Sequence, residues 1–287
     1  MRSRRTQAHR QGGFTLVELI VTIVLIGALV GVSAVFIVQP FQASEDLERR
    51  AALVDSADLA LDRITREARR ALPNSVRVNG DGDQVEFIPV RVGARYRRLP
   101  GGGSNDTFVP ARQQDTFDIL GGVFLDGDEL DAIDDAAGGA GTECGGGNPC
   151  ISVYNTGQSG FNAYDEENIA QITSLESTSL GYDNGGANEP AFRAHSPQQR
   201  FYIFDDVVSY RCTNGQLLRS SGYGLNGSIV AEPSNDPQVV TRNVASCDFR
   251  YAAGTAARRS LLTLRLELER GGERVFLLDQ AQVSNTP

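Results

Sequence analysis

The chain has 287 residues, of which 40% are hydrophobic, and its formal net charge at pH 7 is −9. This length allows a sizeable core, and we expect one domain carried on a stalk. The acidic balance disfavours a general affinity for nucleic acid, so we expect no nucleic-acid partner.

An unbroken apolar run from Phe14 to Val38 follows a short basic leader, residues 1–13. The run has 25 residues, and roughly 20 apolar residues suffice to cross a bilayer as a helix. It is too long for the core of an ordinary secretory signal. The arginines of the leader predict that the leader stays cytoplasmic and that the domain after the apolar run lies outside. Glu18 is the single carboxylate in the run, and a carboxylate inside a membrane segment is costly and usually functional.

The segment from Gly13 to Glu18, GFTLVE, resembles the cleavage and methylation segment of type IV pilins and type II secretion pseudopilins. The resemblance implies that a prepilin peptidase cuts after Gly13 and methylates the new amine on Phe14. Without the four leader arginines the net charge becomes −13. An amine on Phe14, of this or a neighbouring subunit, would supply the positive partner that Glu18 needs. The alternative is a plain single-span anchor in which Glu18 has no role.

We expect residues 14–40 to form the transmembrane and assembly helix. Gly27 and Gly31 lie one turn apart, and small residues at that spacing let another helix approach closely. Pro40 removes one helical hydrogen bond, so the helix is expected to bend or melt somewhere between Gly27 and Pro40. The exact place is left open by the sequence.

Residues 41–72 are predicted to continue the helix with an amphipathic pattern, which Pro73 and Asn74 end. Apolar residues recur at helical spacing and define one face. They are Leu47, Val54, Leu61, Ile64, Ala68 and Leu72.

The remainder, residues 73–287, is predicted to be one β-rich globular domain. The fold class is α+β and pilin-like, with a long N-terminal helix packed on an antiparallel β-sheet domain. Residues 84–90 and 94–99 are predicted to form a hairpin, and Asn214-Gly215 and Gly271-Gly272 mark two tight turns. Further strands are expected at 76–78, 151–155, 199–204, 207–212, 217–219, 246–251, 262–269 and 275–278. Loops are expected at 100–112 and 154–168.

Four cysteines all lie in the part expected to be exported: Cys144, Cys150, Cys212 and Cys247. An even number in an oxidising compartment predicts two disulfides. We expect Cys144 to pair with Cys150 across the loop CGGGNPC, and Cys212 to pair with Cys247 between two strands. A four-cysteine zinc site does not fit, because no pair has the short spacing that such sites use.

An acidic stretch from Asp115 to Glu143 contains nine acids and no arginine, which predicts a solvated surface loop. Its carboxylates also suit calcium, although their spacing does not match an EF-hand loop. The calcium alternative uses Asp126, Asp128 and Asp131, with Asp134 and Asp135 nearby. No other cofactor is expected.

No residue pattern predicts catalysis. His195 is the single histidine after the leader, lies two residues before Pro197 and is expected to be a surface loop residue. No G-x-S-x-G segment or phosphate-binding loop accompanies it. We therefore expect a substrate of the prepilin peptidase and N-methyltransferase, not an enzyme.

Several further segments resemble the O-type minor pilins of the mannose-sensitive haemagglutinin (MSHA) pilus, a group similar to W-type minor pilins and the J pseudopilins of type II secretion. They are RRAALVDSADLAL, RRALPNSVRV, VEFIPVRVGARYR, SVYNTG, QRFYIFDDVVSYRC, ASCDFRY and the closing hairpin. The resemblance implies a low-abundance subunit that primes or caps a filament. The alternatives are a minor pseudopilin of type II secretion and a tip-borne module for binding or adhesion.

This resemblance also implies partners and a location. The expected partners are other minor and major pilins, through helix packing, and the prepilin peptidase. A stable soluble homo-oligomer is not expected. The chain would cross the inner membrane once with its globular domain in the periplasm, and would then join a pilus at the cell surface.

Overall fold

The structure is a computed structural model that describes residues 13–100, 107–112, 114–137, 144–185, 190–233, 236–255 and 258–287. The side chains of residues 34–43 are not described either. The basic leader up to residue 12, residues 101–106 of the predicted loop at 100–112 and the side chain of Pro40 therefore lie outside the description. The chain divides into two units, Met1–Ala51 and Ala52–Pro287, and each is treated by itself.

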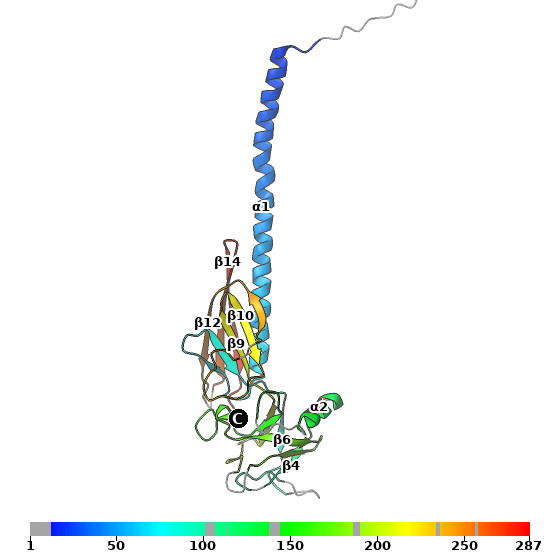
Figure 1. Ribbon diagram of the computed structural model, residues 1–287, viewed down its shortest axis with the longest axis vertical. Helices are drawn as coiled ribbons and strands as arrows, with labels where there is room; N and C mark the ends of the chain where they lie inside the picture. Colours follow the sequence, from blue (N-terminus) through cyan, green and yellow to red (C-terminus); the bar gives the residue numbers. More distant parts are fainter. Residues whose placement is uncertain are drawn as a thin grey trace, which may run out of the picture. The chain divides into compact units, whose positions relative to one another are not determined.

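One helix, α1 (Leu16–Arg69), contributes to both units (Figure 1). Its 54 residues are helical without interruption, including position 40. Of the two outcomes expected between Gly27 and Pro40, melting is absent from this structure, and bending stays a prediction. A proline removes one hydrogen bond of the ladder, and the helical residues on both sides keep the remaining ones.

Half of the buried hydrophobic side chains of α1 in the second unit are alanines. Leu53, Ala57, Ala60, Leu61, Ile64 and Ala68 are all buried. Leu61, Ile64 and Ala68 belong to the predicted apolar face, whereas Val54, also on that face, is 38% exposed. The prediction did not include Ala57 and Ala60, because it followed mainly the large apolar side chains.

The end of α1 is held by two asparagines. Asn155 donates from its side chain to the carbonyl of Pro73 at 2.7 Å, and Asn74 donates to the carbonyl of Asn155 at 2.9 Å. Asn74 has a φ of 62°, a conformation that asparagine tolerates better than most residues. Because Leu72 already donates its N–H to Ile88, α1 stops at Arg69, three residues before the predicted end.

Two antiparallel sheets form a core with α1. The five-stranded sheet has the order β1 (Arg77–Val78), β2 (Gln84–Phe87), β9 (Val208–Thr213), β10 (Gln216–Ser221) and β11 (Gln238–Arg242). The three-stranded sheet has the order β12 (Val244–Ala252), β13 (Ser260–Arg270) and β14 (Glu273–Val283). Leu262, Leu264, Leu266 and Leu268 of β13 alternate with polar residues in the sequence, and all four point into this core.

Both predicted tight turns are present. Asn214 and Gly215 have φ values of 48° and 72°, and Gly271 and Gly272 have values of 60° and 84°. Two consecutive positive φ values give the turn whose twist matches that of the flanking strands. These turns set the registers of the β9–β10 and β13–β14 hairpins.

A closed barrel accounts for six further strands and was not predicted. Its order is β3 (Val92–Tyr96), β4 (Thr116–Leu120), β7 (Ser179–Tyr182), β6 (Ile169–Leu175), β5 (Cys150–Ser152) and β8 (Arg200–Phe204). Its aromatic core contains Tyr96, Phe108, Phe117, Tyr182, Phe192 and Phe201. Figure 1 shows β4 and β6 grouped apart from β9, β10, β12 and β14.

The predicted hairpin of residues 84–90 and 94–99 is wrong. β2 pairs with β1 and β9, whereas β3 pairs with β4 and β8. Pro89 lies between them and lacks the N–H that a continuous ladder would need. The chain therefore leaves the five-stranded sheet here and enters the barrel.

The acidic stretch is not simply a loop. It contains β4 and the helix α2 (Gly127–Ala137), in which Ile133 and Ala137 are buried against the barrel core. These two residues lie one turn apart and give α2 an apolar side that the dense charges concealed. The predicted loop at 154–168 likewise contains a short 3-10 helix, η1 (Ala163–Asp165).

Candidate functional site

The side chain of the residue just before α1 caps the first turn of the helix. Thr15 precedes the helix, and its hydroxyl oxygen accepts a hydrogen bond from the N–H of Glu18 at 3.3 Å. Its carbonyl accepts from the N–H of Leu19 at 3.2 Å. Thr15 is thus the N-cap, and Glu18 occupies the third helical position. Sequence reasoning assigned no role to Thr15, although T-x-x-E before an apolar run is a recognised helix-start pattern.

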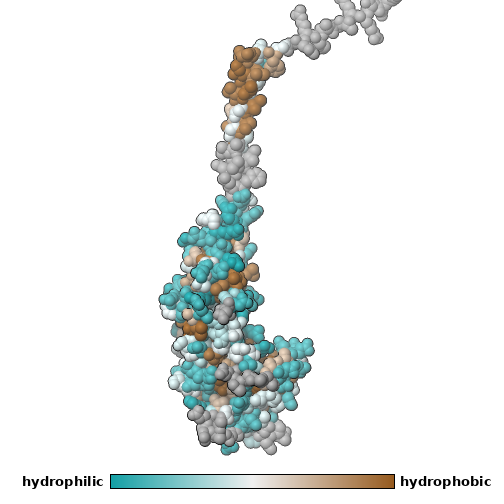
Figure 2. Space-filling view, viewed as in Figure 1, coloured by the Kyte–Doolittle hydropathy of each residue, from teal (hydrophilic) through white to brown (hydrophobic). Residues whose placement is uncertain are grey.

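The apolar part of α1 that follows is exposed along its described length. Every large apolar side chain from Phe14 to Val32 is at least 49% exposed in the isolated chain. Figure 2 shows this segment as a nearly continuous hydrophobic surface. Residues Leu16–Ser33 are long and apolar enough to cross a membrane. Exposed apolar surface of this extent requires lipid or other helices around it.

Gly27 and Gly31 leave open positions on this helix. A β-carbon added at either glycine would meet no atom within 4 Å in the isolated chain. No contact within the described chain therefore requires glycine at these two positions. It permits a second helix to approach the backbone closely, which is how small residues act in membrane helices.

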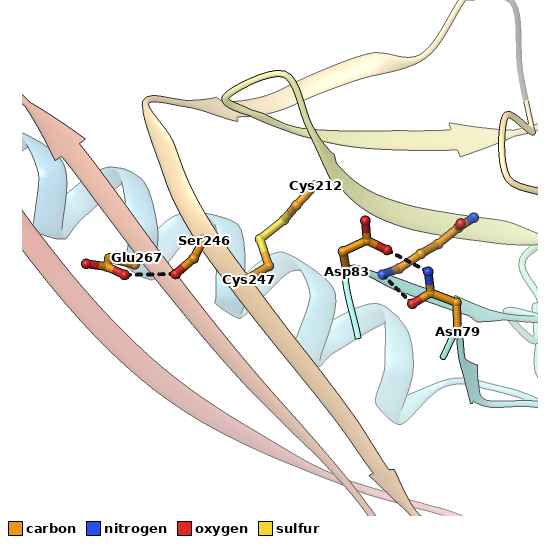
Figure 3. The surroundings of a disulfide bond; sticks show 7 residues. Asn79, Asp83, Cys212, Ser246, Cys247 and Glu267 are labelled. Carbon is orange, nitrogen blue, oxygen red and sulfur yellow. Dashed lines mark hydrogen bonds between the residues drawn. A yellow bond between two sulfur atoms is a disulfide. The ribbon is translucent and has the colours of Figure 1, made fainter. Parts of the chain in front are cut away.

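The two expected disulfides are both present. Cys144 is joined to Cys150 with 5.7 Å between their Cα atoms, and Cys212 is joined to Cys247 with 6.3 Å. The second bond connects β9 to β12 and so ties the five-stranded sheet to the three-stranded one (Figure 3). Beside it, Ser246 donates to Glu267 at 2.8 Å and fixes the neighbouring β12–β13 pair.

The carboxylates considered as calcium ligands do not converge on one point. Asp126 accepts from the N–H of Glu129 at 2.8 Å at the start of α2, and Asp134 accepts from the N–H of Leu175 at 2.8 Å. Asp128 and Asp131 lie on the exposed side of the helix. Across the described residues, no three acidic, histidine or cysteine side chains are placed to hold a metal. A helix disperses these carboxylates around its axis, whereas a calcium loop folds them inward.

His195 lies in a loop, as predicted, but its side chain is half-buried rather than fully at the surface. Its ring stacks on Tyr96 with centroids 5.8 Å apart, and its Nδ1 lies 3.2 Å from the Tyr96 hydroxyl. Burial, with a smaller contribution from the nearby Arg98 charge, lowers the pKa of His195. Ser196 donates to the carbonyl of Pro287 and accepts from the N–H of Arg200, so its hydroxyl serves the fold.

Glu86 is a buried carboxylate with a structural role. Arg77 donates to it from Nε at 2.7 Å, and the hydroxyl of Tyr223 donates at 3.0 Å. Burial raises the pKa of Glu86, and the Arg77 charge opposes that change. Arg77 also donates to the carbonyls of Asn226 and Gly227. This network pins the segment after β10 onto β1 and β2.

The N-terminal helix is therefore the candidate functional surface, and the comparison with known families identifies its first part. A family model for the prokaryotic N-terminal methylation motif matches residues 8–34. This segment is a type IV pilin-like prepilin signal. No curated protein and no solved structure matches the chain.

The prepilin signal gives the chain a general role. It supports a structural subunit of the pilin or pseudopilin kind and indicates no enzyme family. Such subunits are processed by a prepilin peptidase and assemble with other pilins. The exposed helix that follows fits a single membrane anchor.

Proposed function

We propose that the chain is a minor prepilin subunit of an MSHA-like type IV pilus, and that it primes or caps filament assembly through its N-terminal helix. The observation that carries the proposal is the prepilin signal followed by an exposed apolar helix with one carboxylate, Glu18. The minor and MSHA-like assignments rest on the resembling segments given above. The globular unit would lie in the periplasm before assembly and on the pilus afterwards.

Glu18 and Phe14 are the proposed assembly pair. Cleavage after Gly13 would free the amine of Phe14, which is then methylated and keeps its positive charge. A carboxylate in hydrocarbon is costly when alone, and docking against a neighbour's amine relieves that cost. Because removal of one member of a buried pair leaves the other uncompensated, the pair would also fix the register between neighbouring helices.

Two measurements on the full chain test this proposal. Mass analysis should show a mature protein that begins at Phe14 with a methylated amine. Glu18→Ala protein should reach the membrane at its normal level, while co-purification with other pilus subunits falls by about tenfold or more. Glu45→Ala, which removes a carboxylate farther along α1, is the matched control and should co-purify normally. Undiminished co-purification of Glu18→Ala would contradict the pairing.

A further inference from the structure

Strand β14 is an uncovered edge of the three-stranded sheet. It pairs with β13 along its whole length and with no other strand among the described residues. The other outer strand, β12, is covered, because the N–H of Phe249 donates to the carbonyl of Gly82 at 2.7 Å and the Cys212–Cys247 disulfide joins β12 to β9. The sheet therefore ends openly only on the β14 side.

The register of the β13–β14 hairpin shows which backbone groups of β14 point outward. The residues that flank a two-residue turn exchange both of their hydrogen bonds, and the strands then alternate. Arg270 and Glu273 flank the turn here, so Glu273 and every second residue after it bond to β13. In agreement, the N–H of Glu269 points the other way and donates to the carbonyl of Asn243 at 2.8 Å. The intervening residues of β14 direct their N–H and carbonyl groups away from the sheet.

Part of this edge carries backbone groups without a partner. Arg274, Phe276 and Leu278 have no backbone hydrogen bond on the outer side within the described chain. Gln280 differs, because its N–H donates to the side chain of Asp279 at 2.7 Å. We call residues 274–278 the open edge. Unpaired N–H and carbonyl groups in a row are a template on which an extended segment of another chain adds as a further strand.

The open edge lacks the features by which edge strands usually avoid such pairing. Natural edges are protected by charged side chains, prolines or bulges. Residues 275–278 read Val-Phe-Leu-Leu, and their register with β13 continues without a shift. Phe276 is 61% exposed and Leu278 is 49% exposed. This stretch is therefore apolar, regular and suited to strand pairing.

The polar side chains on the same face of the sheet already have partners. Asp248 pairs with Arg265 at 3.5 Å, and Glu267 pairs with Arg274 at 3.1 Å. The exposed apolar side chains of the open edge have no further strand beyond them. A strand added there would cover these apolar side chains and would leave the ion pairs intact.

The open edge lies beside α1. Thr65 of α1 donates to Asp279 of β14 at 2.7 Å, and the hairpin is directed back along the helix (Figure 1). Val54 and Asp58 share the side of α1 that carries Thr65, because they precede it by about three and two helical turns. Val54 is 38% exposed, and Asp58 has no ion pair among the described residues. An added strand would therefore meet one apolar and one acidic side chain of α1.

We propose that the open edge binds an extended segment of a different pilin-type subunit, which adds as a fourth strand to this sheet. The inference rests on the proposed function. The chain carries a prepilin signal, such subunits assemble with other pilins, and the open edge runs beside the helix that carries the assembly surface. Strand addition would extend that surface onto the globular unit.

The contacts define the chemistry of the occupant. Its backbone supplies N–H and carbonyl groups to the open edge, apolar side chains cover Phe276 and Leu278, and a basic side chain on the opposite face meets Asp58. A second copy of this chain is not the occupant, because a subunit that primes or caps a filament is present at low abundance. A single added strand also suits that role, since it binds one neighbour and does not repeat.

A proline at an outward-facing position tests the proposal. Leu278→Pro removes an N–H that points away from β13, so the β13–β14 ladder keeps its hydrogen bonds. The tagged full chain is expressed in its own host and extracted in mild detergent, and co-purified pilin-type subunits are recognised by their methylated N-terminal peptides. Leu278→Pro should reduce their yield by about tenfold, and Leu278→Ala, which keeps the N–H, should reduce it less. An undiminished yield with Leu278→Pro, or an equal loss with Leu278→Ala, would overturn the proposal.

Gln282→Pro is the matched control. The N–H of Gln282 also points away from β13, but it lies beyond Asp279 and outside the open edge. This variant should co-purify normally, and a loss equal to that of Leu278→Pro would count against the proposal, because any proline in β14 would then suffice. Native disulfides on a non-reducing gel show that each variant has folded.

Two direct measurements do not depend on a proline variant. The amides of Phe276 and Leu278 should exchange hydrogen about tenfold or more slowly in the purified complex than in the chain alone, because pairing protects them. Unchanged exchange at both amides would overturn the proposal. A photoreactive benzoylphenylalanine in place of Phe276 should crosslink to a peptide of another pilin-type subunit, whereas crosslinks to lipid or to a second copy of this chain would contradict it.

The mass of the mature N-terminus, measured on the same samples, tests the proposed function separately. Processing at Gly13 does not depend on the open edge. A chain that is cut and methylated at Phe14 but shows neither protection nor a crosslink would retain the proposed function and refute this inference alone.

Discussion

Loss of the Cys212–Cys247 disulfide should destabilise the globular unit more than loss of the Cys144–Cys150 disulfide. The two bonds span sequence separations of 35 and 6 residues. A crosslink restricts the unfolded chain, and the loop-entropy relation gives about 3.8 kcal/mol for the longer loop and about 2.2 kcal/mol for the shorter one. The longer bond also connects β9 to β12, which belong to different sheets.

These free energies translate into different melting temperatures. For a unit spanning residues 52–287, the entropy of unfolding is on the order of 0.5 kcal/mol/K. The melting temperature should therefore fall by about 8 °C in Cys212→Ala/Cys247→Ala and by about 4 °C in Cys144→Ala/Cys150→Ala. Near-ultraviolet circular dichroism of the full chain in detergent reports this unit, because it senses packed aromatic side chains.

The shorter bond provides the sharpest check of the reasoning. It closes a loop in which Gly145 lies so close to Gly224 and Leu225 that an added β-carbon would come within 3.1 Å of them. If Cys144→Ala/Cys150→Ala lowers the midpoint as much as the other variant, native contacts of this loop dominate and the entropy argument is refuted. Peptide mapping without reductant verifies the connectivity in the starting protein.

Two further predictions concern the globular unit. Because the pKa of His195 is lowered in the folded chain, the unfolded chain binds a proton at His195 more readily. The contribution of His195 to stability should therefore be fully present above about pH 6.5 and should be lost as the pH falls below that value. His195→Gln should flatten the change in melting temperature between about pH 7.5 and 5.5, and an unchanged slope would contradict this cause. Leu264→Ala on β13 should cost about 2–5 kcal/mol in urea unfolding, because Leu264 is fully buried. Leu278→Ala, at a half-exposed position of β14, should cost about 1 kcal/mol or less, and equal losses would contradict the assigned orientation of the hairpin.

Local signals explain the successful predictions. The apolar run predicted the start of α1, the Asn-Gly and Gly-Gly pairs predicted two hairpin turns, and the alternating leucines predicted the buried side of β13. Each depends on residues only a few positions apart. The same holds for Thr15, whose capping role was overlooked although its signal is equally local.

Failures arose where distant segments determine the structure. Strands β6 and β7 were missed because their aromatic and aliphatic residues form a core only after the barrel closes. Helix α2 was missed because Ile133 and Ala137 become an apolar face only when a barrel is present to cover them.

The sequence by itself determined the prepilin signal, the apolar helix with Glu18 and the pairing of cysteines across plausible loops, because covalent order and hydropathy depend on the chain alone. Only the tertiary structure decided that residues beyond Pro89 leave the sheet for a barrel. It alone placed Arg95 opposite Arg200, and it alone showed that His195 is half-buried against Tyr96. Strand register and burial depend on contacts between residues far apart in the chain, and no local pattern specifies those contacts.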